Sequence, residues 1–381
     1  MASKAPSPHT LDPSPGTARV QVKQSPLLNL QSSAVIHITN SNGTTRTHQP
    51  STLDLKSEIL AGLRSPSPSL PSLLLWGDNG IRHFNNLTLH PNYYPSRTEL
   101  AMITQYAEAF ASMTPAGGIL LELGCGNLHK TSIILSAFHH LRRPINYYAL
   151  DVSEAELHSS VKMLRQDFAH SQFISINGLY GTYDDCGAWL LSLSTSSPPY
   201  GLPNLVAGQV ISFLWIGNSI ANMHPSEATE MLCKFQNACS ASQLQCQFLI
   251  GSDACDDPAA VLKAYNPSNQ VFNDFILSGL DYANDILGGK VFRREDFQVE
   301  SKFDSTKRLL STYYVTNKRV ELDWDNHACR DSARRFLEKG ERVCIIFSYK
   351  WSVEGFSRIC ENAGMQIARR WTDKTIDYSN P

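Results

Sequence analysis

Short apolar runs alternate along residues 98–252 with segments whose apolar residues recur every three or four positions. The runs have the length of strands buried on both faces of a parallel sheet, and lie at 119–123, 147–150, 172–176, 209–215 and 247–251. The periodic segments predict helices at 99–113, 130–141 and 226–239. Thr98 is expected to cap the first helix, and Ser153 with Glu156 has the spacing of a capping box for another. This alternation predicts an α/β fold with a mostly parallel sheet.

Beyond residue 253 the pattern changes. Asp257 and Pro258 have the residue types of a helix cap and a first helical residue, and a longer periodic segment predicts a helix at 270–287. The elements expected after it are strands at 310–315 and 319–324 joined by 316–318, a helix ended by Gly340, a strand at 343–349, a helix ended by Gly364 and a strand at 365–371. Hairpin-like strands with helices predict an α+β region beside the parallel sheet.

The first 50 residues are rich in Ser, Pro, Thr and Asn and contain one short apolar stretch, so much of this segment cannot offset the entropy cost of its ordering. A helical pattern follows at 53–63, and the globular part is expected to begin near Ser69. The predicted organisation is a partly flexible segment at 1–68, a parallel α/β core at 98–252, and an α+β domain made of 69–97 and 253–381.

Composition excludes several classes of function. The 33 Lys and Arg residues nearly balance the 35 Asp and Glu residues, and the net charge of −2 supplies no basic field for nucleic acid or an anionic membrane. No apolar run reaches the length of a membrane-spanning helix, and the N-terminal residues lack a signal peptide's apolar segment. The nine cysteines contain no CxxC pair, and no histidine spacing matches a metal motif. We therefore expect a cytoplasmic protein with a small-molecule partner and no metal, and the oligomeric state stays open.

A glycine turn and an acidic residue carry the first chemical signal. Gly124 and Gly126 separate the run at 119–123 from the next helix, so the backbone can approach a ligand there and the helix N-terminus can bind a polar group. Asp151 ends the following strand, where nucleotide-binding α/β proteins hydrogen-bond a ribose. Lys130 stands where a third glycine would favour a dinucleotide. The pattern thus favours an adenosyl cofactor without pyrophosphate over the dinucleotide of a nicotinamide-dependent dehydrogenase.

Two further segments have polar residues beside the predicted core. The sequence NYYPSRT, at 92–98, precedes the first core helix, and GNSIAN, at 217–222, follows a core strand. Each taken alone is typical of a helix entry or a turn. The second falls at the carboxyl end of a parallel strand, where open sheets bind their ligands.

Together these motifs resemble the histidine-specific methyltransferase family, which makes the trimethylhistidine precursor of ergothioneine. The resemblance runs from about Leu73 to Trp371, and rests on NYYPSRT at 92–98, LELGCGNLHKT at 121–131, YALDVSE at 148–154, GTYDD at 181–185, GNSIANMHP at 217–225, Ala264-Tyr265 and SYKW at 348–351. The forms LLWGDNGIRHF at 74–84, GTYDD and SYKW look closest to a fungal branch that includes dimethylallyltryptophan N-methyltransferases. The resemblance implies that 98–252 is a Rossmann-like methyltransferase core that binds S-adenosyl-L-methionine (SAM). It also implies that 69–97 and 253–381 form the substrate-binding domain.

The resemblance also implies roles for individual residues. The residues expected to contact SAM are Tyr93, Gly124, Gly126, Lys130, Asp151 on the ribose, and Leu179 and Tyr180 by the adenine. Those expected around the substrate are Trp76, Phe84, Gly217, Asn222, Tyr265, Thr312, Ile346 and Ser348. Of these, Asn222 and Tyr265 match groups that hold the substrate carboxylate, and Trp76 stands where relatives carry a tyrosine that helps hold the amine. Tyr265, Asn222 and Trp76 are the predicted catalytic residues.

Two departures from the family pattern concern the substrate side chain. Histidine-methylating members have a glutamate at the position of Ile346 and a methionine at that of Thr312, and the glutamate hydrogen-bonds the imidazole. An imidazole N–H facing Ile346 would lose a charge-assisted hydrogen bond worth about 1.5–3 kcal/mol. A larger apolar side chain, such as an indole with or without a prenyl group, fits this position better. At the cofactor end, Leu179 replaces an aspartate of bacterial members.

The predicted function is therefore SAM-dependent α-N-methylation of a small amino acid or derivative with an apolar, aromatic side chain, as in alkaloid biosynthesis. Three alternatives stay open. These are trimethylation of histidine for ergothioneine, a nicotinamide-dependent dehydrogenase, and a SAM-binding relative without catalytic activity.

Overall fold

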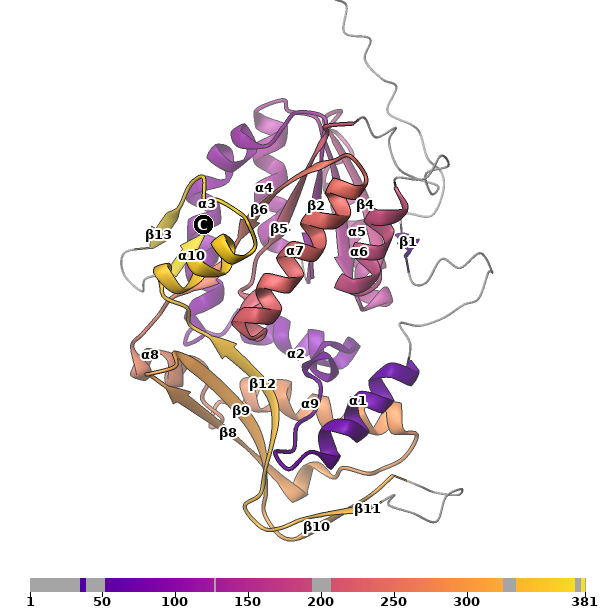
Figure 1. Ribbon diagram of the computed structural model, residues 1–381, viewed down its shortest axis with the longest axis vertical. Helices are drawn as coiled ribbons and strands as arrows, with labels where there is room; N and C mark the ends of the chain where they lie inside the picture. The colour runs from indigo at the N-terminus through magenta and orange to yellow at the C-terminus, as the bar shows by residue number, and fades with distance from the viewer. Residues whose placement is uncertain are drawn as a thin grey trace, which may run out of the picture. The chain divides into compact units, whose positions relative to one another are not determined.

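A parallel sheet of six strands occupies the upper part of the computed structural model in Figure 1. The structure describes residues 35–38, 52–126, 128–193, 207–324, 334–373 and 378–380. The strands are β1 (Val35–His37), β2 (Gly118–Leu123), β3 (Ile145–Asp151), β4 (Ile174–Tyr180), β5 (Val210–Trp215) and β6 (Gln245–Ile250). Their order is β1-β4-β3-β2-β5-β6, and every neighbouring pair is parallel. The predicted α/β class is confirmed.

Helices cover both faces of this sheet. They are α3 (Tyr94–Met113), α4 (His129–His140) and α5 (Glu154–Asp167) on one face, and α6 (Tyr183–Ser192), α7 (Pro225–Ala241) and α10 (Val353–Asn362) on the other. Successive side chains of β2 point to opposite faces, so Leu120 packs in the core under α3–α5 while Leu121 and Leu123 pack under α6, α7 and α10. Burial on both sides explains why the strands read as continuous apolar runs. The arrangement is Rossmann-like.

A second, antiparallel sheet lies beside four helices and a short 3-10 helix (Figure 1). The strands are β8 (Phe297–Asp304), β9 (Leu309–Thr316) and β12 (Arg342–Tyr349), in the order β12-β9-β8, and the helices are α1 (Thr52–Arg64), η1 (Ser72–Trp76), α2 (Asp78–Thr88), α8 (Pro258–Ala264) and α9 (Gln270–Leu287). These elements share a core of their own, in which the Tyr314 hydroxyl of β9 donates a hydrogen bond to the Ile276 carbonyl of α9. Residues 32–381 form one unit, and its division near residue 252 into two domains stays a prediction.

The smaller elements complete the described chain. They are η2 (Ser219–Asn222), β7 (Ser252–Asp253), η3 (Arg294–Asp296), β10 (Val320–Asp323), β11 (Arg334–Leu337), β13 (Trp371–Asp373) and β14 (Tyr378–Asn380). Strands β13, β14 and β7 form a small sheet, and β10 pairs only with β11 within the described residues.

Strand pairing in the C-terminal half corrects the sequence prediction. The strands β9 and β10 are consecutive but do not pair, because β9 lies between β8 and β12 and β10 pairs with β11. The helix predicted before Gly340 is wrong, since β11 occupies 334–337 and its Arg334 lies against Glu321 of β10. The strand predicted at 365–371 is wrong as well: residues 365–370 have no regular structure, and β13 begins at Trp371.

Two boundaries in the N-terminal half also differ from the prediction. Helix α3 begins at Tyr94 with Pro95 in its first turn, so Thr98 lies inside the helix and does not cap it. The first turn of a helix tolerates proline, because the backbone N–H that proline lacks would have no hydrogen-bond partner within the helix at that position. Strand β4 starts at Ile174 and extends to Tyr180, four residues past the predicted end, because it pairs along its length with β3.

The packed part of the chain begins earlier than Ser69. Leu55, Ile59 and Leu63 of α1 are buried in the core beneath the antiparallel sheet, and Ile59 and Leu63 are wholly inaccessible. Strand β1 adds to the edge of the parallel sheet beside β4. Both elements fall within the segment 1–68 that the sequence predicted to be partly flexible.

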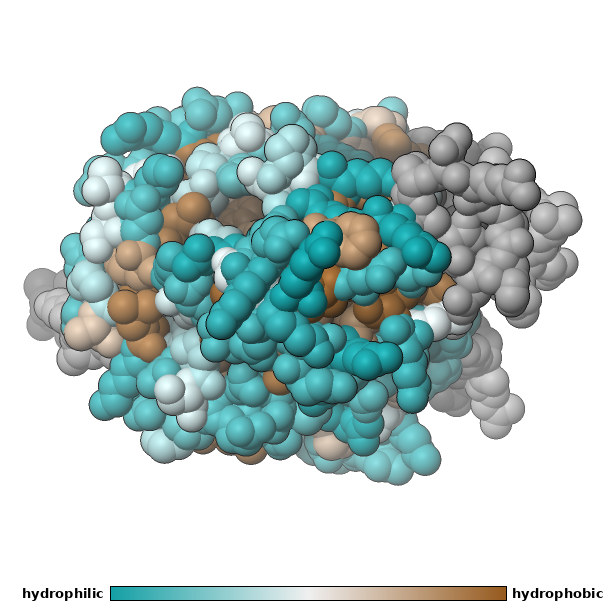
Figure 2. All heavy atoms as spheres, turned by 90° about the horizontal axis from the view of Figure 1, so that it is seen from below, coloured by the Kyte–Doolittle hydropathy of each residue, from teal (hydrophilic) through white to brown (hydrophobic). Residues whose placement is uncertain are grey.

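The surface at the lower end of the view in Figure 1 is mostly hydrophilic, with smaller hydrophobic areas between the polar side chains (Figure 2). Ion pairs such as Arg319–Glu338 and Arg334–Asp323 lie near β10 and β11. None of the helices in the described part of the chain combines the length and apolarity needed to cross a bilayer.

Replacing Ile59 by Ala should destabilise the protein by about 2–5 kcal/mol, because it leaves a cavity under α1 that the surrounding core fills only in part. Chemical denaturation of the wild type and the variant measures the difference. Ser57→Ala, at an exposed position of the same helix, is the matched control and should change stability by less than about 0.5 kcal/mol. Equal stability of all three proteins would contradict the packing of α1.

Candidate active site

A cavity of about 1880 Å³ opens where β2, β3, β4 and β5 end, and the facing wall comes from α2, α9, β9 and β12. Pockets for a single small molecule typically measure roughly 300–1,000 Å³. The space is therefore sufficient for a cofactor and a substrate side by side. All of the predicted site residues except Leu179 line it: Trp76, Phe84, Tyr93, Gly124, Gly126, Lys130, Asp151, Tyr180, Gly217, Asn222, Tyr265, Thr312, Ile346 and Ser348.

The glycine turn after β2 lies against the end of β3. The N–H groups of Gly124 and Cys125 donate to the Leu150 carbonyl, 3.0 and 3.1 Å away. Gly124 and Gly126 have φ angles of +73° and +55°, which other residues adopt only with strain. A Cβ atom on Gly124 would also lie 3.0 Å from the Tyr183 hydroxyl. Glycine at both positions keeps the backbone open toward the cavity, as a flat nucleoside requires.

The Asp151 carboxylate is held in place by backbone donors. Oδ1 accepts the N–H groups of Val152 and Ser153 at 2.8 and 3.1 Å, and Oδ2 accepts that of Gly126 at 3.1 Å. The thiol of Cys125, 3.6 Å from Oδ2, is a weak donor that a hydroxyl group can displace. Burial raises the pKa of Asp151, while these N–H groups act in the opposite direction. These donors occupy only part of the acceptor positions of the Asp151 carboxylate. The carboxylate could therefore accept a further hydrogen bond from a ribose hydroxyl in the cavity.

Leu179 and Tyr180 take opposite sides of β4. Leu179 is fully buried in the core under α6 and α7 and is not part of the cavity wall, whereas Tyr180 is. Neighbouring residues of a strand face opposite ways, so only Tyr180 presents its side chain to the cavity, and the placing of these two residues by the adenine stays a prediction.

A buried carboxylate connects two of the predicted site residues. Glu99 of α3 pairs with Lys130, and both of its oxygens accept the Gly217 N–H, at 2.8 and 3.0 Å. The Gly217 N–H is therefore engaged within the protein. If the Gly217 backbone contacts a ligand, it can therefore do so only through its carbonyl oxygen.

The opposite wall contains a buried network that the sequence did not identify. Lys350 and Asp253 form an ion pair of 2.9 Å, and both side chains are wholly inaccessible. The Lys350 ammonium also donates to the hydroxyls of Tyr265 at 3.1 Å and Ser348 at 3.3 Å, and Tyr94 donates to Asp253 at 2.6 Å. Lys350 stood in the quoted motif SYKW, but an isolated lysine in a strand gives no sign that it will be buried.

Tyr265 is the point where this network meets the cavity. Burial and the nearby Asp253 carboxylate raise the pKa of Tyr265, so its hydroxyl stays protonated. The oxygen accepts from Lys350, and the hydroxyls of Tyr93 and Ser348 are also hydrogen-bonding neighbours of Tyr265. A ligand in the cavity that accepts the Tyr265 hydrogen would compete with these hydroxyls.

Aromatic rings line the same side of the cavity. Trp76 of η1 lies 5.1 Å from Phe84 and 5.6 Å from Phe275, measured between ring centroids, and Phe84 lies 6.2 Å from Tyr93. Trp76 and Phe84 were predicted, while Phe275 of α9 was not. From the sequence, an apolar residue in a periodic helical segment is expected to be buried in the core. Only the packing of α9 against α2 places Phe275 in the wall of the cavity.

Two predicted substrate residues are partners across the antiparallel sheet. Ile346 of β12 pairs directly with Thr312 of β9, next to a bulge between Cys344 and Ile346. Both residues line the cavity, as does Ser348 two positions further along β12. The three positions that the family resemblance connects with the substrate side chain therefore belong to one patch of the wall.

Comparison with known proteins identifies the family of this chain. The pattern of a family described as "Histidine-specific methyltransferase, SAM-dependent" matches residues 55–380. The chain belongs to this family. It is a SAM-dependent N-methyltransferase, and the dehydrogenase alternative is excluded.

Three relatives represent the family. N-methyltransferase imqF of Aspergillus flavus is 35% identical over 86% of this chain and 84% of its own length. Ergothioneine biosynthesis protein 1 of Neurospora crassa is 31% identical over 84% of this chain, which covers 34% of that longer protein. The 4-dimethylallyltryptophan N-methyltransferase easF of Epichloe festucae var. lolii is 28% identical over 87% of this chain and 94% of its own length.

Asp151→Ala should weaken SAM binding tenfold or more in calorimetry, because the variant loses a charge-assisted hydrogen bond to the ribose worth about 1.5–3 kcal/mol. The matched control is Asp184→Ala, which removes an exposed acid of the same cavity wall and should leave SAM affinity unchanged. A folded Asp151→Ala variant with wild-type affinity would remove Asp151 from the cofactor site.

Proposed function

We propose that this methyltransferase transfers the methyl group of SAM to the α-amino group of a small amino acid or derivative whose side chain is apolar and aromatic, of the tryptophan type. The observation that carries the proposal is the pairing of Ile346 with Thr312 in the cavity wall. The printed names of the relatives, which include an N-methyltransferase and a dimethylallyltryptophan N-methyltransferase, support the same class of reaction.

The side-chain end of the cavity favours an apolar ring. Ile346 presents a branched alkyl group where the histidine-methylating pattern has a carboxylate. The aromatic rings of Trp76, Phe84 and Phe275 lie in the same wall, and rings of this kind bind another aromatic group by offset or edge-to-face contacts. Ser348, whose oxygen accepts hydrogen bonds from Lys350 and Asn218, adds one small polar group beside this apolar region.

The carboxylate of the amino acid would bind at the other end of this wall. The Tyr265 hydroxyl has a hydrogen to donate, and Asn222 of η2 lines the cavity from the parallel-sheet side. Lys350 acts through Tyr265, because its own side chain is wholly buried behind the tyrosine. An amino acid held at both points bridges the two sheets.

The amine would then lie near the carbonyl of Gly217 and the rings of Trp76 and Phe84. SAM supplies a methyl group already activated by the sulfonium, so the protein needs no strong general base if the amine binds after losing its proton to solvent. The chain's residues contribute by orientation: they hold the nitrogen about 3–3.5 Å from the methyl carbon and keep water out.

Tyr265→Phe should raise the substrate KM by about tenfold to a hundredfold and leave SAM affinity unchanged, because it removes a hydrogen bond to the substrate carboxylate. Asn222→Ala should act in the same direction. Tyr349→Phe, which loses a hydroxyl bound to His224 outside the cavity, is the control. Equal turnover of an amino acid and its decarboxylated amine would rule out this carboxylate site.

Ile346→Glu should shift preference from an aromatic apolar amino acid toward histidine, since a buried carboxylate can accept the imidazole N–H but is costly beside an apolar ring. Transfer of isotope-labelled methyl from SAM to histidine, tryptophan, tyrosine and dimethylallyltryptophan gives the ratio of kcat/KM for each protein. Ile346→Val, which keeps the wall apolar, should retain the wild-type preference.

The same assay separates the alternatives. Preference of the wild type for histidine would overturn the side-chain assignment and favour the ergothioneine reaction. Absence of transfer to every amino acid, with SAM still bound, would favour a relative without this catalytic activity.

A further inference from the structure

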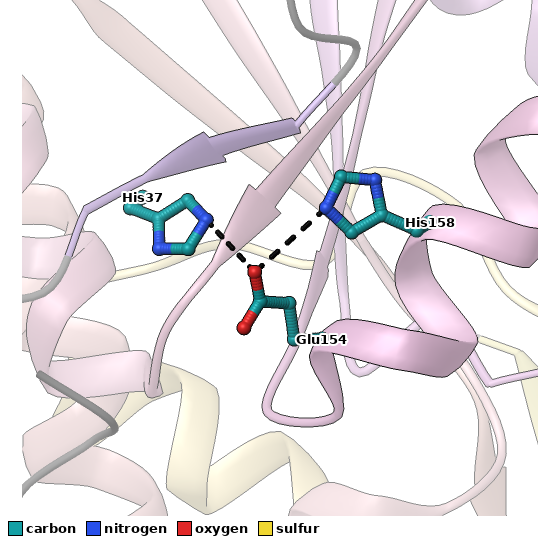
Figure 3. A group of neighbouring side chains, drawn as sticks. All are labelled: His37, Glu154 and His158. Carbon is teal, nitrogen blue, oxygen red and sulfur yellow. Dashed lines mark ion pairs between the residues drawn. The ribbon is translucent and has the colours of Figure 1, made fainter. Parts of the chain in front are cut away.

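Three side chains of types that can bind a metal ion converge at the edge of the parallel sheet (Figure 3). His37 comes from β1, and Glu154 and His158 lie one turn apart on α5. The Glu154 Oε1 atom lies 3.1 Å from His37 Nε2 and 3.8 Å from His158 Nε2, and the three ligand atoms are all within 4.8 Å of one another. The two histidines are 121 positions apart in sequence, so no spacing motif could reveal the group.

The spacing of these atoms suits one ion. Zinc binds imidazole nitrogen and carboxylate oxygen at about 2.0–2.2 Å in a tetrahedral arrangement, which places neighbouring ligand atoms about 3.3 Å apart. Two histidines and one glutamate are also a ligand set of open zinc sites. All three side chains are about half exposed, at 51%, 47% and 47%, so an ion can enter and keep water in its remaining position.

An aromatic ring supports one of the three side chains. The ring of Tyr180 contacts that of His37 edge to face at 5.1 Å, which restricts the orientation of the imidazole.

We propose that His37 Nε2, His158 Nε2 and Glu154 Oε1 bind a divalent transition-metal ion of the zinc class. The ion joins β1 to α5 and has a structural role. Its place is the rim of the active-site cavity, since Glu154, His158 and Tyr180 all belong to the cavity wall. The proposal does not depend on the substrate assigned above.

Calorimetric titration of the full chain with ZnCl₂ tests the site, with thermal unfolding measured in parallel. The wild type should bind one ion at this site and unfold at a higher temperature with zinc, since a ligand that binds only the folded state stabilises it. His37→Gln, Glu154→Gln and His158→Gln should each weaken binding about tenfold or more and lose the zinc-dependent shift, while unfolding like the wild type without metal.

The matched control is His170→Gln. His170 contacts His139 in a separate group of histidines, so this variant should bind zinc like the wild type. Titration with Co²⁺ identifies the ligands: histidine and carboxylate ligands give d–d absorption without the sulfur-to-metal charge-transfer band of a thiolate. No binding by the wild type, equal binding by all variants, loss of binding in His170→Gln, or a thiolate band would each overturn the proposal.

Discussion

The buried ion pair between Lys350 and Asp253 connects the parallel sheet to the antiparallel sheet behind one wall of the candidate active-site cavity. Lys350 comes directly after β12. Asp253 is the last residue of β7, the short strand that follows β6 in the chain. Asn218, after β5, adds a second link, because its amide accepts the Asp253 N–H at 2.8 Å and donates to Ser348 at 3.2 Å. Two charges out of contact with water are costly unless each is paired and hydrogen-bonded, so their mutual arrangement is tightly specified.

This constraint gives the two walls of the cavity different chemistry. On the parallel-sheet side, polar backbone groups and the Asp151 carboxylate meet at the strand ends, because parallel strands expose their carboxyl ends at one edge. On the other side, the strand pair β9–β12 presents side chains, among them Ile346 and Thr312. Changes in those side chains alter one wall while the backbone contacts of the other stay the same. A single scaffold can therefore serve N-methyltransferases with different substrates.

In the proposed reaction, the protein contributes to methyl transfer mainly by positioning its ligands. Tyr265 illustrates this: burial keeps its phenol protonated, and its oxygen accepts a hydrogen bond from the Lys350 ammonium. Under that proposal neither group needs to exchange a proton during the reaction. The ring cluster of Trp76, Phe84 and Phe275 gives the same cavity an apolar wall.

Local pattern was sufficient for much of the fold. The helix predicted at 270–287 matches α9 at both ends, because an asparagine cap and a glycine with positive φ act within one turn of the chain. Five of the six parallel strands, all except β1, were found because burial on both faces leaves continuous apolar runs. The glycine turn and Asp151 were recognised for a similar reason, since each lies at a strand end that the pattern locates.

Tertiary structure decided what depends on distant partners. The pairing of β9 with β12 and of β10 with β11, the burial of Lys350 beside Asp253, and the direction of Leu179 away from the cavity all follow from contacts between residues far apart in sequence. The group of His37, Glu154 and His158 arises in the same way, because β1 joins the sheet beside β4. The sequence by itself determined which segments become strands and helices and which strand ends carry polar groups. Only packing, which buries a charge or a strand edge when a complementary partner is present, decided which of these side chains meet.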